Sequence, residues 1–146
     1  MKRNIVIGVD PDCLKSGLAV YELGILKELH NMTYIDFVSY CAKIKFENCI
    51  FVIEDGNLIS GLYSRNRHGN KAIQHKISES VGANKQRATD LIEVAKYFGI
   101  PVIRRKPRKG NWANKKAMFE KVTGWKGQSN PETRSAAFFG YFEANK

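Results

Sequence analysis

The sequence has no long hydrophobic run and few cysteines, and both absences narrow the classes of protein to which it can belong. No apolar stretch approaches the roughly 18 residues that a membrane-spanning helix needs. The basic residues at the start precede only a short apolar run, so we do not expect a secretory signal peptide. Cys13, Cys41 and Cys49 are odd in number and show no CxxC spacing, which predicts reduced, mostly buried thiols in a cytoplasmic protein that does not contact a membrane.

Acidic side chains are also scarce, with 14 Asp and Glu against 24 Lys and Arg, so the formal net charge is +10. A surplus of this size favours an anionic partner, either nucleic acid or another anionic surface. The length of 146 residues, the absence of internal repeats and the 43% hydrophobic content predict one globular domain over residues 1–146.

Two apolar runs each end on a carboxylate. Residues 5–9 lead into Asp10, and residues 49–53 lead into Glu54. Two neighbouring buried strands that finish in acids direct both side chains to one edge of a sheet, and hard divalent cations prefer oxygen ligands. Glu132, in the first turn of the expected last helix, completes a predicted cluster of three carboxylates. Alone, an acid after a strand is more often a turn residue or a helix N-cap.

The order of the expected elements indicates an α/β protein, a mixed sheet with helices on both faces. Residues 4–9 predict a central strand, residues 18–23 and 25–31 a hairpin around Gly24, and residues 49–54 and 102–104 two further strands. Helices are expected from Thr33, over residues 80–98 and 114–122, and from Asn130-Pro131. Residues 55–78 lack a periodic apolar pattern and predict a mobile loop.

Two basic stretches are candidates for contacts with a nucleic-acid backbone. The first is the expected loop, where Tyr63 is available to stack on an unpaired base; its basic candidates are Arg65, Arg67, His68, Lys71 and Lys76. The second follows the last expected strand and contains Arg105, Lys106, Arg108 and Lys109. For both stretches, a merely solvated surface is the alternative interpretation.

Aromatic residues gather in the last expected helix. Phe138, Phe139, Tyr141 and Phe142 have helical spacing, and we expect all four to belong to the core.

These motifs, in this order, resemble the RuvC-type Holliday-junction resolvases of the ribonuclease H-like superfamily. The resemblance covers nearly the whole length and is most specific at Ile7-Gly8-Val9-Asp10-Pro11, at the strand ending in Glu54, and at Val81-Gly82-Ala83-Asn84. The small size and the stretch 123–127 look more like phage or prophage members. The resemblance implies a ribonuclease H-like mixed five-stranded sheet, a homodimer, Mg²⁺ or Mn²⁺, and paired nicking of four-way DNA junctions in recombination, repair or phage DNA processing.

By motif, the resemblance gives Asp10, Glu54 and Glu132 the roles of metal ligands, and Lys115 looks like the family's lysine near the scissile phosphate. Two positions depart from the pattern. Ser135 stands where the family's last helix normally has a second acid, and a serine hydroxyl is a weak, neutral ligand. Asn57 stands where some members carry an aromatic wedge, a role that Tyr63 is placed to take over.

Three hypotheses remain beside a junction-cleaving, metal-dependent endonuclease. In the first, the chain is a junction-binding protein that lost turnover through Ser135. In the second, it is another ribonuclease H-like nuclease with a different substrate. A phosphotransferase of the actin and sugar-kinase type is loosely suggested by Gly8-Val9-Asp10, but that fold needs more than twice this length.

Overall fold

The computed structural model describes residues 4–44, 48–59 and 71–146. The strands are β1 (Ile5–Asp10), β2 (Ser16–Glu22), β3 (Ile25–Met32), β4 (Cys49–Glu54) and β5 (Val102–Arg105). The helices are α1 (Tyr34–Lys43), the short 3₁₀ turn η1 (Gly56–Leu58), α2 (Lys71–Tyr97), α3 (Lys116–Thr123) and α4 (Pro131–Ala144).

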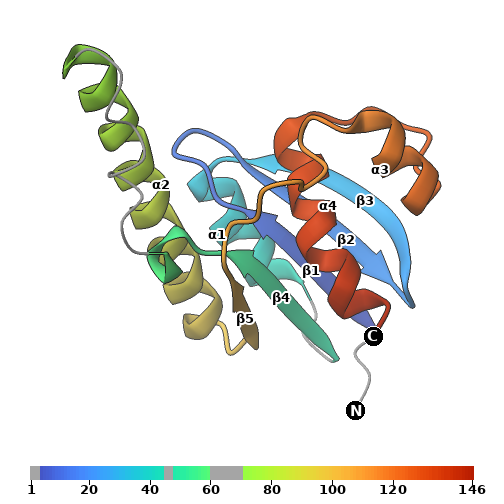
Figure 1. The fold of residues 1–146 in the computed structure, drawn as a ribbon. Helices are drawn as coiled ribbons and strands as arrows, with labels where there is room; N and C mark the ends of the chain where they lie inside the picture. The colour runs from blue at the N-terminus through green and yellow to red at the C-terminus, as the bar shows by residue number, and fades with distance from the viewer. Residues whose placement is uncertain (1–3, 45–47, 60–70) are drawn as a thin grey trace.

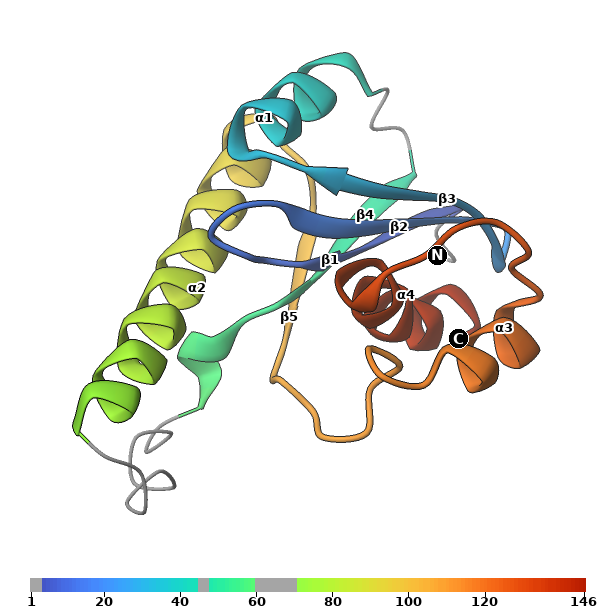
Figure 2. The ribbon, with the colours of Figure 1, turned by 90° about the horizontal axis from the view of Figure 1, so that it is seen from above.

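The five strands form one mixed sheet in the order β3-β2-β1-β4-β5. The first three strands are antiparallel neighbours, whereas β1, β4 and β5 run parallel. Helices α1 and α2 cover one face of the sheet, and α4 with α3 beside it lies on the other (Figures 1 and 2). The predicted mixed α/β sheet with helices on both faces is therefore confirmed.

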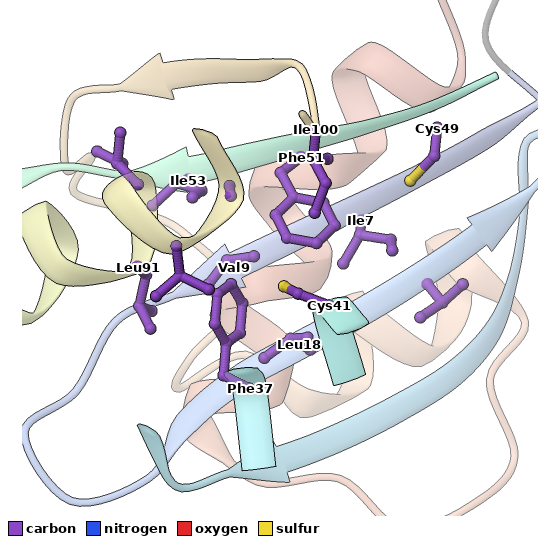
Figure 3. Packing of buried hydrophobic residues seen from close by; sticks show 14 residues of the cluster. Ile7, Val9, Leu18, Phe37, Cys41, Cys49, Phe51, Ile53, Leu91 and Ile100 are labelled. Atoms are coloured by element: carbon purple, nitrogen blue, oxygen red, sulfur yellow. The ribbon is translucent and has the colours of Figure 1, made fainter. Parts of the chain in front are cut away.

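Each face of the sheet has its own apolar core. Under α1 and α2, Phe37 packs edge-on against Phe51, and Leu91 closes the cluster from α2 (Figure 3). Under α4, Trp112 packs against Phe138 at 5.4 Å between ring centroids. Burial on both faces explains why β1 and β4 read as continuous apolar runs rather than alternating ones.

Helix α4 approaches the sheet unusually closely, because glycines lie at the contact. A Cβ atom on Gly8 would meet the carbonyl oxygen of Ala136 and would lie 2.9 Å from the amide nitrogen of Gly140. A Cβ atom on Gly17 would likewise meet the backbone of Glu132. This contact sets the distance between the first turns of α4 and the end of β1.

Several local signals act as the sequence predicted. Thr33 and Asp36 form a reciprocal capping box at the start of α1, and Asn130 caps α4 with Pro131 in its first turn. The hairpin turns at Leu23-Gly24, both with positive φ.

Two expectations were wrong. Residues 71–78, expected as loop, are the first turns of α2, so Lys71 and Lys76 lie on a helix. These turns project beyond the sheet (Figure 1). A helical segment that packs against no core needs no apolar stripe. An apolar stripe is the pattern from which a helix is predicted in a sequence, so these turns were missed. Phe142 was expected in the core but is 51% exposed.

Two composition-based expectations concern the thiols and the membrane. Cys41 and Cys49 are buried, Cys13 is exposed, and all three are free thiols, as predicted. None of the helices in the described part of the chain is long and apolar enough to cross a membrane.

Candidate functional site

Asp10 and Glu54 end two neighbouring parallel strands, so both carboxylates lie at the same edge of the sheet. They line a cleft of about 170 Å³ between the strand ends and α2. The other lining residues are Pro11, Gly56, Val81, Asn84, Lys85 and Pro107. The structure thus brings together the two acids that the sequence analysis paired.

The electrostatics of this pair are those of two like charges removed from water. Burial, and after it the charge of Glu54, raises the pKa of Asp10 to about 8. Burial also raises the pKa of Glu54. Both carboxyl groups are therefore easier to protonate in the folded protein than in water, and they titrate as an interacting pair.

Ser135 adds a hydroxyl to this pair from α4. Its Oγ donates to Oε2 of Glu54 over 3.4 Å, and its side chain is almost fully buried. A hydrogen bond from Ser135 also lowers the pKa of Asp10, against the larger effect of burial.

Glu132 lies farther out. Its charge raises the pKa of Asp10, but its side chain lines a neighbouring hollow with Asp12, Leu14 and Lys15. Among residues 4–44, 48–59 and 71–146, no three His, Cys, Asp or Glu side chains are grouped so that they could hold a metal ion. A ligand role for Glu132 stays a prediction.

The donor set at the cleft nevertheless fits a hard divalent cation. Mg²⁺ is commonly held by one or two carboxylates and keeps several waters. Two largely buried carboxyl groups with raised pKa values, with a hydroxyl beside them, are such a set. A bound cation would favour the ionised form of both groups, and so offset the burial that raises both pKa values and the repulsion that adds to it at Asp10.

Behind the cleft, Asp55 joins three elements, a role that the sequence analysis missed. Its buried carboxylate accepts hydrogen bonds from Nε of Arg104 at 2.8 Å and from the backbone and side-chain nitrogens of Asn57. Burial alone would raise the pKa of Asp55, but these hydrogen bonds outweigh it and lower the pKa. Asn57 also donates to the carbonyl of Lys85 in α2. Asn57 therefore acts here as a connecting residue.

The loop after Asp10 is held against α2 by two hydrogen bonds. The amide of Cys13 donates to Oδ1 of Asn84 at 3.1 Å, and Arg87 donates to the carbonyl of Cys13 at 3.2 Å. Asn84 belongs to a motif that the sequence analysis singled out, whereas nothing pointed to Arg87. Together they fix the position of the Asp10 strand end relative to the helix.

Lys115 is the N-cap residue of α3, and a buried arginine holds the chain just before it. Arg134 in α4 donates twice to the carbonyl of Ala113, at 3.0 and 2.8 Å, and once to Oγ of Ser129. Lys115 is exposed, and its ammonium lies near Gly110 rather than among the residues that line the cleft.

The predicted DNA-contacting residues fall into three groups. Tyr63, Arg65, Arg67 and His68 lie outside the described residues. Lys71 and Lys76 are exposed on the projecting turns of α2. Arg105, Lys106 and Arg108 line a groove with Leu58, Arg104, Pro107 and three phenylalanines of α4, and Lys109 is exposed next to them.

This basic–aromatic groove, as we call it, has a volume of about 700 Å³. It meets the carboxylate cleft at Pro107, which lines both. The geometry thus places a positively charged groove directly beside the two acids.

Comparison with known proteins gives a clear result only for the structure. Neither the protein-family models nor the curated proteins match the sequence. Among solved structures, RuvC of T. thermophilus in complex with a Holliday junction substrate superposes with a TM-score of 0.61, over 94% of this chain and 90% of that one. A second Thermus thermophilus RuvC structure gives 0.58, over 94% and 91%. The chain has the RuvC fold.

Sequence identity to both RuvC structures is 16%, so the likeness establishes the architecture alone. The ribonuclease H-like fold predicted from the order of the motifs is confirmed. The RuvC fold also accounts for the sheet order β3-β2-β1-β4-β5, which places the ends of β1 and β4 side by side.

Proposed function

We propose that the protein is a metal-dependent, structure-selective DNA endonuclease that resolves four-way junctions by paired nicks. The observation that carries this proposal is the convergence of Asp10 and Glu54 in one cleft, beside a basic groove, within a RuvC fold. That one of the matched structures holds a Holliday junction supports the choice of substrate.

In this proposal Asp10 and Glu54 hold Mg²⁺ or Mn²⁺, and Ser135 and Glu132 contribute through hydrogen bonds, water or direct ligation. A cation held there would supply charge stabilisation to the phosphodiester and would make a water easier to deprotonate. Burial keeps the two carboxylates oriented toward one point, and the Ser135 hydroxyl fixes Glu54. We propose that the exposed Lys115 contacts DNA.

The basic residues bind and position the DNA strands. We propose phosphate contacts for Arg105, Lys106, Arg108, Lys109, Lys71 and Lys76, and for Arg65, Arg67 and His68, with Tyr63 stacking on a base. Two nicks at a near-twofold-symmetric junction require two active sites, so we propose that the protein acts as a homodimer.

The test is incubation of labelled four-way junctions with Mg²⁺ or with Ca²⁺, with binding and nicking scored separately. We expect Asp10→Asn to abolish nicking and to keep junction binding, because it removes a ligand without adding volume. Asp90→Asn, on α2 outside the residues that line the cleft, is the matched control and should nick normally. Full nicking by Asp10→Asn would remove this residue from the site and overturn the assignment.

A second candidate, a junction-binding protein without turnover, is favoured by one observation. Glu132 faces a neighbouring hollow and Ser135 is neutral, which leaves two carboxylates at the cleft. Tight junction binding without nicking, in Mg²⁺ and in Mn²⁺ alike, would support this candidate.

A further inference from the structure

The basic–aromatic groove contains an exposed ring that the proposed phosphate contacts do not use. Phe142 is 51% exposed, while Phe138 and Phe139 next to it are buried. The rings of Phe138 and Phe142 meet edge-on, with centroids 5.1 Å apart. A half-exposed phenylalanine at the end of an ordered aromatic cluster offers a rigid apolar face to a ligand.

The charge of the groove is only partly neutralised by the protein itself. Arg104 pairs with Asp55, and Arg105 lies 3.8 Å from Glu143. Lys106 and Arg108 have no acidic partner within residues 4–44, 48–59 and 71–146. The guanidinium of Arg108 instead lies over the ring of Phe138, 5.9 Å from its centroid. Two cations are thus available for an anionic ligand beside an apolar ring.

The volume and the position of the groove narrow the class of ligand. A hollow of about 700 Å³ has the size of a site for small molecules or short chain segments. Because Pro107 lines both the groove and the carboxylate cleft, a strand whose phosphate lies at Asp10 and Glu54 continues into the groove. Double-stranded DNA keeps its base faces stacked, so an exposed ring finds a partner only on an unpaired base.

We propose that the groove binds an unpaired stretch of the DNA strand that leaves the carboxylate cleft, with a base stacked on Phe142 and phosphates at Lys106 and Arg108. This inference rests on the proposed function, since it takes the cleft to hold a phosphodiester. It adds a base-binding subsite on α4, distant in sequence from Tyr63.

The test separates base contacts from phosphate contacts. Affinities of a six-nucleotide oligo(dT) and of an abasic oligomer with the same number of phosphates are measured by fluorescence anisotropy, in Ca²⁺, for the full chain and its variants. Phe142→Leu should weaken oligo(dT) binding about tenfold, within the range of base–aromatic stacking, and change binding of the abasic oligomer less than twofold. Lys106→Ala and Arg108→Ala should weaken binding of both oligomers and flatten the salt dependence.

Matched controls lie outside the groove. Tyr97→Leu removes an aromatic ring that is 84% exposed, and Lys27→Ala removes an exposed cation on β3, at the opposite edge of the sheet. Both variants should bind the two oligomers as the parent does. Circular dichroism and thermal unfolding establish that Phe142→Leu is folded.

A second measurement does not depend on any variant. Oligo(dT) carrying 5-iodouracil should photo-cross-link to the α4 peptide that contains Phe142. Cross-links confined to other peptides, or an equal effect of Phe142→Leu on both oligomers, would overturn the proposal. A third outcome would also overturn the proposal: hexaglutamate displaces oligo(dT) as effectively as the abasic oligomer does. That result would assign the groove to an acidic protein segment.

The outcome is independent of junction cleavage. If junctions are nicked but Phe142→Leu binds oligo(dT) normally, the groove proposal fails and the endonuclease proposal stands. If junctions are not nicked but the base-dependent loss is found, the groove remains a site for unpaired DNA and the endonuclease proposal fails.

Discussion

At the scale of single residues, Ser135 decides how much negative charge the site holds. It is buried and contacts Glu54, so a carboxylate at this position would be the third at the cleft. Without a cation, another buried charge raises the repulsion that already shifts the pKa of Asp10. With a cation, it supplies a good oxygen ligand.

We therefore expect Ser135→Asp to lower the melting temperature in EDTA and to increase the stabilisation by Mg²⁺. If the missing ligand limits turnover, nicking should rise at least tenfold, which requires a barrier lower by about 1.4 kcal/mol. Asparagine has nearly the same volume as aspartate but no charge, so Ser135→Asn should show neither the larger stabilisation by Mg²⁺ nor the faster nicking. A Ser135→Asp variant that responds to Mg²⁺ like the parent would place residue 135 outside the metal site.

The raised pKa of Asp10 makes the stability of the metal-free protein depend on pH. Between the ordinary value of 3.8 and about 8, the folded state holds a proton on Asp10 that the unfolded state has lost. Stability from this group is therefore present at low pH and is lost as pH rises through that window. Asp10→Asn removes this dependence.

The expected result is a difference in melting temperature between Asp10→Asn and the parent, in EDTA, that grows by several degrees from pH 4 to pH 8. Adding Mg²⁺ at pH 8 should reduce the difference, because the cation neutralises the carboxylates of the parent. A difference that stays constant with pH would mean that Asp10 ionises as easily in the folded protein as in the unfolded chain.

At the scale of elements, the contact of α4 with β1 holds the site together. Ser135 reaches Glu54 only because Gly8, Gly17 and Gly140 let the helix lie against the strands. The hydroxyl of Tyr21 adds a buried hydrogen bond of 2.7 Å to the carbonyl of Ala137. The alignment of the site is thus a property of helix packing.

Gly8→Ala should destabilise the protein by about 3 kcal/mol, since the added methyl meets backbone that cannot rotate away. The variant should also lose more nicking than its loss of stability explains, measured at a temperature where it remains folded. Gly82→Ala is the control: a Cβ there meets nothing within 4 Å, and alanine inside a helix stabilises by up to about 1 kcal/mol. Equal stability of both variants would refute the tight contact.

The elements also show how far sequence reasoning reaches. Asp10 and Glu54 could be predicted as a pair because each ends an apolar run, and parallel strands bring such ends to one edge. The start of α4 could be predicted from Asn130-Pro131, since capping is local chemistry. The start of α2 could not, because its first turns face solvent and carry no apolar stripe.

Contacts between residues far apart in the sequence could not be predicted, because they depend on how the elements pack. Asp55 looked like the start of a loop, although its partner Arg104 is 49 positions away and only the pairing of β4 with β5 brings them together. Phe142 follows the spacing of buried neighbours, yet its ring is half exposed, although Ala144 further along α4 is buried. Local patterns predict which elements form, and tertiary packing decides which side chains meet.

At the scale of the whole molecule, the net charge of +10 governs how binding responds to salt. If each protomer of a dimer neutralises about four phosphates, the logarithm of the junction affinity should fall with the logarithm of salt concentration with a slope of about −7. Lys106→Ala should flatten the slope by roughly one unit per protomer, and Lys27→Ala should leave it unchanged. A slope near zero would exclude a phosphate backbone as the principal contact.

The order in which the chain is made has a consequence for the two carboxylates. Asp10 and Glu54 end the first and the fourth strand in chain order, whereas Ser135 and the helix that covers Val6, Ala19 and Val52 follow all five strands. Until α4 has emerged, one side of the growing sheet stays open to water and the acidic pair lacks its hydroxyl. A half-made chain therefore exposes the apolar surface that α4 later covers, which favours aggregation, and its acidic pair stays incomplete until synthesis has passed α4.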